Sequence, residues 1–168
     1  QIIALNGDMD VRGATVDYLP PMPVVTGVDA HMEFDDKTFN IFMKSGRSEN
    51  LTVERGKFFI TGLRDVDQFA DVELLIKGDF ADQLKYIDHQ PLGFASALAI
   101  SAEKAKGRAT TELDLKFILE KDVTLDQVEV SGKARLDDIS MASVFLGRGI
   151  DHGNLEIDVD KKGVTVKG

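Results

Sequence analysis

The stretch GRATTELDLKFIL, residues 107–119, decides the predicted fold because its side chains alternate in polarity. One alternate set is mostly apolar and comprises Ala109, Thr111, Leu113, Leu115, Phe117 and Leu119. The residues between them are mostly charged, and a period of two is typical of a strand with one dry and one wet face. At roughly 3.3 Å per residue the stretch spans about 43 Å, whereas the usual strand has about 5–6 residues. The sequence therefore predicts an unusually long strand, apolar along one side.

The same alternation recurs along the chain. It appears in residues 28–34, 39–43, 53–60, 72–80, 128–136, 155–159 and 164–166. The pattern is rougher in 53–60, where we expect a bend or bulge at Gly56. Short polar turns such as FDDKT and DKKG separate several of these stretches. We therefore expect a mainly β fold of about eight to ten strands. Because short turns join neighbouring strands of opposite direction, the strands should be mostly antiparallel.

Two longer crossovers, about 17–26 and 79–106, interrupt the strands. The first contains PPMP, and prolines there oppose regular ladder hydrogen bonds. In the second, Phe80, Leu84 and Ile87 have helical spacing, and Pro91 and Gly93 follow. The pattern predicts one short amphipathic helix, with a second helical turn over 94–99.

The predicted helix is too small to cover the predicted sheet. Eight to ten strands about 4.8 Å apart form a sheet roughly 40–48 Å wide, whereas a helix of about nine residues is roughly 14 Å long. The remaining apolar face must either pack on itself as a closed β-sandwich or barrel, or stay open as a groove. Periodicity alone favours the closed β-sandwich, while the length of the strands favours the open groove.

Composition excludes several classes of function. The chain has 168 residues, a formal net charge of −9 and no cysteine. The length suits a single unit, which we expect to be one segment, 1–168, of a larger protein. The negative charge argues against nucleic acid, whose affinity comes mainly from lysine and arginine on phosphates. No run of about 18 apolar residues marks a membrane-spanning helix. The absence of cysteine excludes disulfides and thiolate metal sites.

No catalytic, cofactor or metal motif stands out. The histidines His31, His89 and His152 lack the spacing of a metal-binding pair. Close carboxylates such as FDD and LDD fall in turns or on wet faces, and DMDVRG has only the beginning of a calcium loop. We therefore predict no enzyme activity, no cofactor and no metal site.

The alternating apolar residues are the candidate site. Any one of them suits an ordinary core, but together flat phenylalanines and flexible methionines could accept a hydrocarbon chain. The candidates for such a groove are Val28, Ala30, Met32, Phe34, Phe39, Ile41, Met43, Phe58, Ile60, Val72, Leu74, Ile76, Ala109, Leu113, Leu115 and Phe117. Phe42, Leu75 and Ile118 fall on the opposite, polar face of their strands.

The chain resembles the AsmA-like superfamily, and most closely the central domain of YhdP-type proteins. The resemblance is carried by DVRGATVDYLPPMPVVTGVDAHMEFDDKTFNIFMKSG, LTVERGKFFITGL, LLIKGDFADQLKYIDHQPLGFAS, AKGRATTELDLKFIL and VEVSGKARLDDI, in that order. The most specific features are Tyr18 with its prolines, and Tyr86 to Leu92 leading to Gly107. Together these features cover nearly the whole chain.

The resemblance implies a long twisted sheet curled into a groove with an apolar floor. It also implies a large periplasmic envelope protein, anchored in the inner membrane of a Gram-negative bacterium, that lets phospholipid move between the inner and outer membranes. The expected partners are phospholipid acyl chains and adjacent segments of the same chain. The alternative function is a structural or protein-interaction β-domain with a closed core and no lipid binding.

Overall fold

The computed structural model describes residues 5–18, 20–97, 100–120, 123–145 and 148–168. In these residues the chain forms one nine-stranded sheet, in which each strand pairs with the next in sequence order and every pairing is antiparallel. The strands are β1 (Asn6–Val16), β2 (Val25–Asp35), β3 (Thr38–Ser48), β4 (Leu51–Thr61), β5 (Phe69–Asp79), β6 (Ala105–Ile118), β7 (Glu129–Phe145), β8 (Arg148–Asp160) and β9 (Gly163–Lys167).

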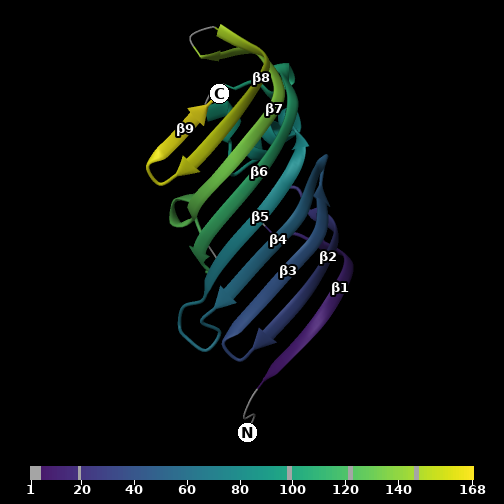
Figure 1. The fold of residues 1–168 in the computed structure, drawn as a ribbon. Coiled ribbons are helices and arrows are strands. Elements are labelled where there is room, and N and C mark those ends of the chain that lie inside the picture. The colour runs from purple at the N-terminus through teal and green to yellow at the C-terminus, as the bar shows by residue number, and fades with distance from the viewer. Residues whose placement is uncertain (1–4, 19, 98–99, 121–122, 146–147) are drawn as a thin grey trace.

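The sheet is not closed. The first and last strands, β1 and β9, each pair on one side only within the described chain, and they lie at opposite margins of the twisted sheet in Figure 1. No second sheet of described residues packs against the first. The prediction of a mainly β, antiparallel sheet curled into a groove is confirmed, and the alternative closed β-sandwich is wrong.

All but one of the helical elements in the described residues belong to the second crossover. They are α1 (Phe80–Asp88), α2 (Phe94–Ala97) and the 3₁₀ turn η1 (Ala102–Lys104), and a further 3₁₀ turn, η2 (Leu125–Gln127), precedes β7. The predicted helix and second helical turn are confirmed, although residues 98–99 lie outside the described chain. The crossover lies behind the sheet in Figure 1, at the ends of β5 to β7.

The two crossovers lie at the same end of the sheet and touch. Tyr18 and Tyr86 share a hydrogen bond between their hydroxyls, and Ser48 at the end of β3 donates to the carbonyls of Pro23 and Val24. Hydrogen bonding to the buried Ser48 thus holds the first crossover against the sheet. We call the described residues of 17–24 and 80–104 the cap.

The core is divided into two clusters. The first lies under the second crossover, where Phe80 and Leu84 of α1 pack on the ends of β6 and β7, and it includes Ile139, which is fully buried. The second lies on β2 to β4 and consists of Val28, Ala30, Met43 and Val53, with half-buried side chains around it. Only the first cluster is a closed core between sheet and helix.

Two local details differ from the prediction. The strand β1 was not predicted, because a bulge at Gly13 interrupts its alternation, where φ is +63° and the backbone N–H donates to the Asp29 carboxylate. Gly56 is also not at a bulge, because it pairs regularly with Met43 and Leu74, and the irregularity of β4 falls between Val53 and Arg55.

Candidate functional site

A row of apolar residues crosses seven strands on one face of the sheet. Residues directly opposite each other in an antiparallel ladder share a face, so the register fixes the members of the row. From β1 to β7 they are Met9, Met32, Ile41, Phe58, Val72, Leu115 and Val130. We call this the central row. At about 4.8 Å per strand it extends about 29 Å across the sheet.

Two parallel rows flank the central row on the same face. The row away from the cap contains Gly7, Phe34, Phe39, Ile60, Ala70 and Phe117. The row toward the cap contains Val11, Ala30, Met43, Gly56, Leu74, Leu113, Gly132, Val159 and Val164. We call the three rows the floor. It contains no polar side chain, so it is a continuous apolar surface.

Most of the floor is only partly covered. The larger side chains of the middle strands, such as Ile41, Phe58 and Leu115, are half-buried. Fully buried floor residues are Ala30, Met43, Ala70 and Val72. At the two ends of the central row, Met9 is 45% exposed and Val130 is 37% exposed. The helical elements pack mainly on β5, β6 and β7 near the cap. The floor is therefore an open surface and not the middle of a closed core.

Thirteen of the sixteen predicted groove residues lie in the floor. They are Ala30, Met32, Phe34, Phe39, Ile41, Met43, Phe58, Ile60, Val72, Leu74, Leu113, Leu115 and Phe117. Val28 and Ile76 lie on the same face but nearer the cap, in the second core cluster and at its margin. Ala109 also lies on that face, but it belongs to the closed core under α1, where it is 2% exposed.

The prediction missed several floor residues. Those on β1 are Met9 and Val11, and those at the far side are Val130, Val159 and Val164. The alternation of Gly7, Met9 and Val11 with Asp8 and Asp10 is a signal for the first group, but it covers only three apolar positions before the bulge at Gly13. Which residues share one row depends on register, which a single sequence does not reveal.

The cap ends the floor on one side. In the next row toward the cap, Thr111 stands between Ile76 and Ala134, and its hydroxyl donates to Gln83 Oε1 of α1 at 2.7 Å. Gln83 Nε2 also donates to the Ala109 carbonyl at 3.0 Å. The polar side chain of Thr111 thus lies on the floor side of the sheet where α1 is attached. The three rows of the floor, which lie farther from the cap, are apolar.

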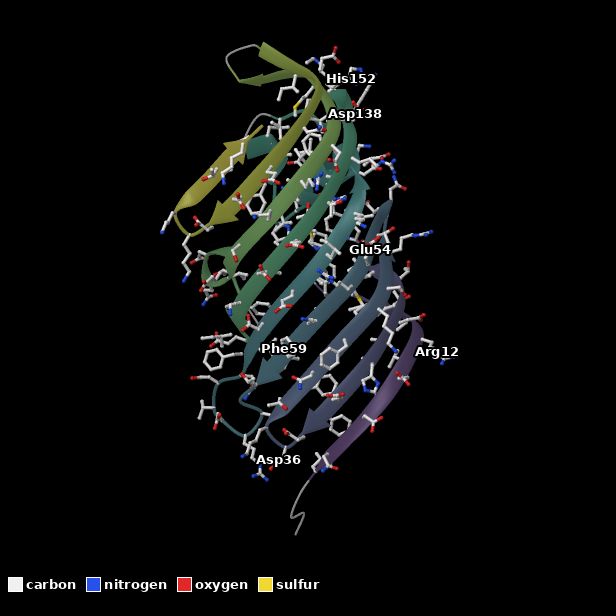
Figure 2. All side chains as sticks on the ribbon, in the orientation of Figure 1. Arg12, Asp36, Glu54, Phe59, Asp138 and His152 are labelled. Carbon is white, nitrogen blue, oxygen red and sulfur yellow. The ribbon has the colours of Figure 1, made fainter. Side chains whose placement is uncertain are left out.

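The outer face of the sheet is charged. Cross-strand ion pairs such as Lys57–Glu73 at 3.1 Å and Lys116–Asp71 at 3.0 Å lie on it. The Asp71 carboxylate raises the pKa of Lys116. Figure 2 shows side chains along the strands of the sheet, with Glu54 and Phe59 labelled on β4. The contrast between a charged outer face and an apolar floor is the main chemical feature of the molecule.

A few apolar side chains interrupt the outer face, as the sequence predicted. Phe42, Leu75 and Ile118 pair with Lys57, Glu112 and Phe69, respectively, on that face. The ring of Phe42 meets the ring of Phe59 edge-on, with 6.0 Å between their centroids. These side chains form pairs of neighbours and no row comparable to the floor.

The floor offers a surface for binding. Among the described residues, no three histidine or carboxylate side chains come close enough together to hold a metal ion. Exposed pairs such as His152–Asp138 and His31–Asp10 lie on the sheet surface and not in a cleft, and Asp138 raises the pKa of His152. A continuous apolar floor without polar anchors is suited to a flexible hydrocarbon chain.

Within the ranges that the structure describes, none of the helices has both the length and the hydropathy that crossing a bilayer requires. No protein-family model, no curated protein and no solved structure matches this chain.

Proposed function

We propose that the chain is a periplasmic segment of an AsmA-like envelope protein whose floor carries the acyl chains of phospholipid between the inner and outer membranes. The full-length protein would be anchored in the inner membrane, and adjacent segments of the same chain would extend the groove. The periplasmic location, the anchor and the two membranes rest on the sequence resemblance. The binding of acyl chains rests on the floor.

The observation that carries the proposal is the uninterrupted central row, from Met9 on β1 to Val130 on β7. Burial of hydrocarbon is worth about 0.8 kcal/mol per methylene, so a tail lying on this row would be held strongly without any polar contact. Adjacent positions on the row are chemically alike, so no single position holds the tail much more strongly than the next. A tail can therefore move along the row in small steps.

The alternative function, a structural or protein-interaction domain, predicted a closed core. Because the sheet is open, the closed core is excluded. The competing hypothesis that remains is a domain that binds other proteins and no lipid. Because exposed apolar patches above a few hundred Å² normally mark binding sites, the experiment has to identify the ligand.

The test places the same charge on the two faces of one strand. Ile41 lies in the central row and its neighbour Asn40 lies on the outer face, opposite Phe59. Delipidated protein is titrated with a fluorescent phospholipid, and the folded state of each variant is checked by circular dichroism. We expect Ile41→Glu to weaken binding by about tenfold or more, because a carboxylate would have to be buried under the tail. Asn40→Glu places its carboxylate opposite Glu33 on the outer face and should lose some stability, but it should bind lipid as the parent protein does.

Native mass spectrometry of the protein purified from a Gram-negative host provides an independent measurement. Phospholipid should remain bound to the parent protein and to Asn40→Glu, and it should be reduced in Ile41→Glu. A parent protein that carries no lipid and takes up none in the titration would refute the proposal.

A further inference from the structure

The two long sides of the floor have different borders. On one side, α1 packs on the ends of β6 and β7 through Phe80 and Leu84, and the first crossover accepts hydrogen bonds from Ser48 at the end of β3. Between these contacts, Glu49 in the turn from β3 to β4 pairs with His89 of the second crossover at 3.2 Å. The cap therefore borders the floor from β3 to β7.

The cap side of the floor has no place for a charged group. Under the cap, Ala109 and Leu136 are each 2% exposed, and Ile139 is fully buried. The polar side chains of Thr111 and Gln83 in the same region are hydrogen-bonded to each other. Moving a charged group from water into such surroundings is strongly unfavourable unless it is paired and hydrogen-bonded. The phosphate of a lipid headgroup is thus disfavoured on this side.

The opposite side of the floor ends in polar turns. Residues 35–38 join β2 to β3, and residues 62–68 join β4 to β5, at the end of the sheet away from the cap. We call these two turns the rim. A backbone hydrogen bond and an ion pair between Asp36 and Arg64 at 2.8 Å hold the two turns together, and Figure 2 labels Asp36 at this end of the sheet.

The rim is open to water. The Arg64 side chain is 59% exposed, and Val66 in the longer turn is 95% exposed. In the shorter turn, the exposed Asp35 carboxylate accepts hydrogen bonds from the backbone N–H groups of Lys37 and Thr38, both at 2.7 Å. A headgroup beside the rim would therefore keep its hydration, while the apolar rows of the floor begin directly next to it.

We propose that a phospholipid bound on the floor has its headgroup at the rim and its acyl chains on the three apolar rows, with the cap as the closed wall behind them. The inference rests on the proposed function and adds an orientation across the groove. The headgroup stays in water while the chains move along the central row. Lipid would enter and leave the floor from the rim side and not past the cap.

A nitroxide quencher at either end of β3 tests this orientation. The chain has no cysteine, so Lys37→Cys at the rim or Asn50→Cys at the cap side can carry a single spin label on an exposed turn. The 11 residues of β3 separate the two positions by roughly 36 Å. Each labelled protein is titrated with a phospholipid that carries a fluorophore on its headgroup. We expect several-fold stronger quenching from position 37 than from position 50.

Two controls separate binding from orientation. A phospholipid with the fluorophore at the end of an acyl chain reports binding itself, and both labelled variants should bind it as the parent protein does. Val66→Cys and Gln90→Cys repeat the comparison at a second exposed position on the rim and a second exposed position on the cap. The label on the rim should again quench the headgroup fluorophore more strongly.

The outcomes distinguish this proposal from the function on which it rests. Equal quenching from the two ends of β3, or stronger quenching from position 50, would overturn the orientation and leave lipid binding intact. A parent protein that binds neither fluorescent phospholipid would refute both proposals together. Strong quenching from both rim positions and weak quenching from both cap positions would support the orientation.

Discussion

Phe58 and Phe59 are neighbours on β4 whose side chains lie on opposite faces of the sheet. Phe58 stands in the central row between Ile41 and Val72, on the floor. Phe59 stands between Asn40 and Asp71 on the outer face, where its ring meets Phe42. Adjacent phenylalanines therefore lie on the apolar floor and on the charged outer face. They form a matched pair for locating a bound lipid.

A photoreactive phenylalanine analogue at each position should distinguish the two faces. On illumination with phospholipid, we expect the analogue at position 58 to form a covalent lipid adduct, because the tail would lie on the central row. The analogue at position 59 should form little or none, because it faces ion pairs and water. Intact-mass spectrometry measures both yields. Equal yields at the two positions would indicate adsorption without a defined groove.

Introducing a charge should separate the open floor from the closed core. Leu113 is a half-buried floor residue between Leu74 and Gly132, whereas Leu136 is 2% exposed under the cap. We expect Leu113→Glu to fold with a loss of about 1–3 kcal/mol, since its carboxylate can reach water. Leu136→Glu should lose more than about 4 kcal/mol or fail to fold. Urea denaturation gives both values.

The opposite order of stability would mean that the floor is covered in solution. A floor carboxylate would then be as costly as one in the core. Because this experiment uses no lipid, it tests the openness of the sheet independently of the function proposed for it.

The sequence was sufficient to assign residues to faces but not to place them in rows. Strict alternation in 107–119 identified Leu113, Leu115 and Phe117 as one face, and the structure confirms that they share it. A period of two carries no information on which residues of neighbouring strands pair, so the members of the central row could not be predicted from the sequence. Strand β1 was not predicted from the sequence, because the bulge at Gly13 shifts the alternation after three apolar positions.

The burial of Ala109 under the cap could not be predicted for a different reason. Ala109 continues the alternation of Leu113 and Leu115, as an open groove residue would. Its small side chain leaves space above the strand, and the helix α1 fills that space. Burial of this residue depends on where the crossover returns over the sheet, and nothing local to residues 107–119 encodes that path.

Removal of the Gln83 side chain should loosen the cap without disturbing the sheet. Gln83→Ala leaves the Thr111 hydroxyl and the Ala109 carbonyl without their partner, and we expect a loss of about 1–2 kcal/mol. Hydrogen exchange should quicken in 80–88 and stay unchanged in β3 and β4. Thr111→Val should recover part of the loss in the double variant, because it removes one of the unpaired groups. Strictly additive effects would contradict this coupling.

The junction of α1 and α2 should weaken in acid. The Ser96 hydroxyl and backbone N–H both donate to the Asp88 carboxylate and lower the pKa of Asp88 from its ordinary value of 3.8. A lowered pKa means that the folded state favours the ionised carboxylate. Its contribution to stability is complete above the ordinary value and is lost as the pH falls through the lowered one. The destabilisation caused by Ser96→Ala should therefore shrink between about pH 6 and about pH 2. Equal destabilisation at every pH would show that this ion does not stabilise the junction.

Gly107 is the position at which the chain leaves the cap and enters β6, and we expect it to tolerate no side chain. Its φ is +107°, and a Cβ there would lie 2.7 Å from the Asp138 carbonyl oxygen and 2.8 Å from that of Asp137. Gly163 in the last turn has φ +136° but no atom within 4 Å of its Cβ position. Gly163→Ala therefore carries backbone strain alone, about 1–2 kcal/mol. Gly107→Ala adds collisions with backbone that cannot move without separating β6 from β7, for a total of about 3 kcal/mol or more. Thermal denaturation of the two variants measures the difference. Equal losses of stability in the two variants would mean that β7 can shift away from Gly107. Gly107 would then not fix the position of the cap over the sheet.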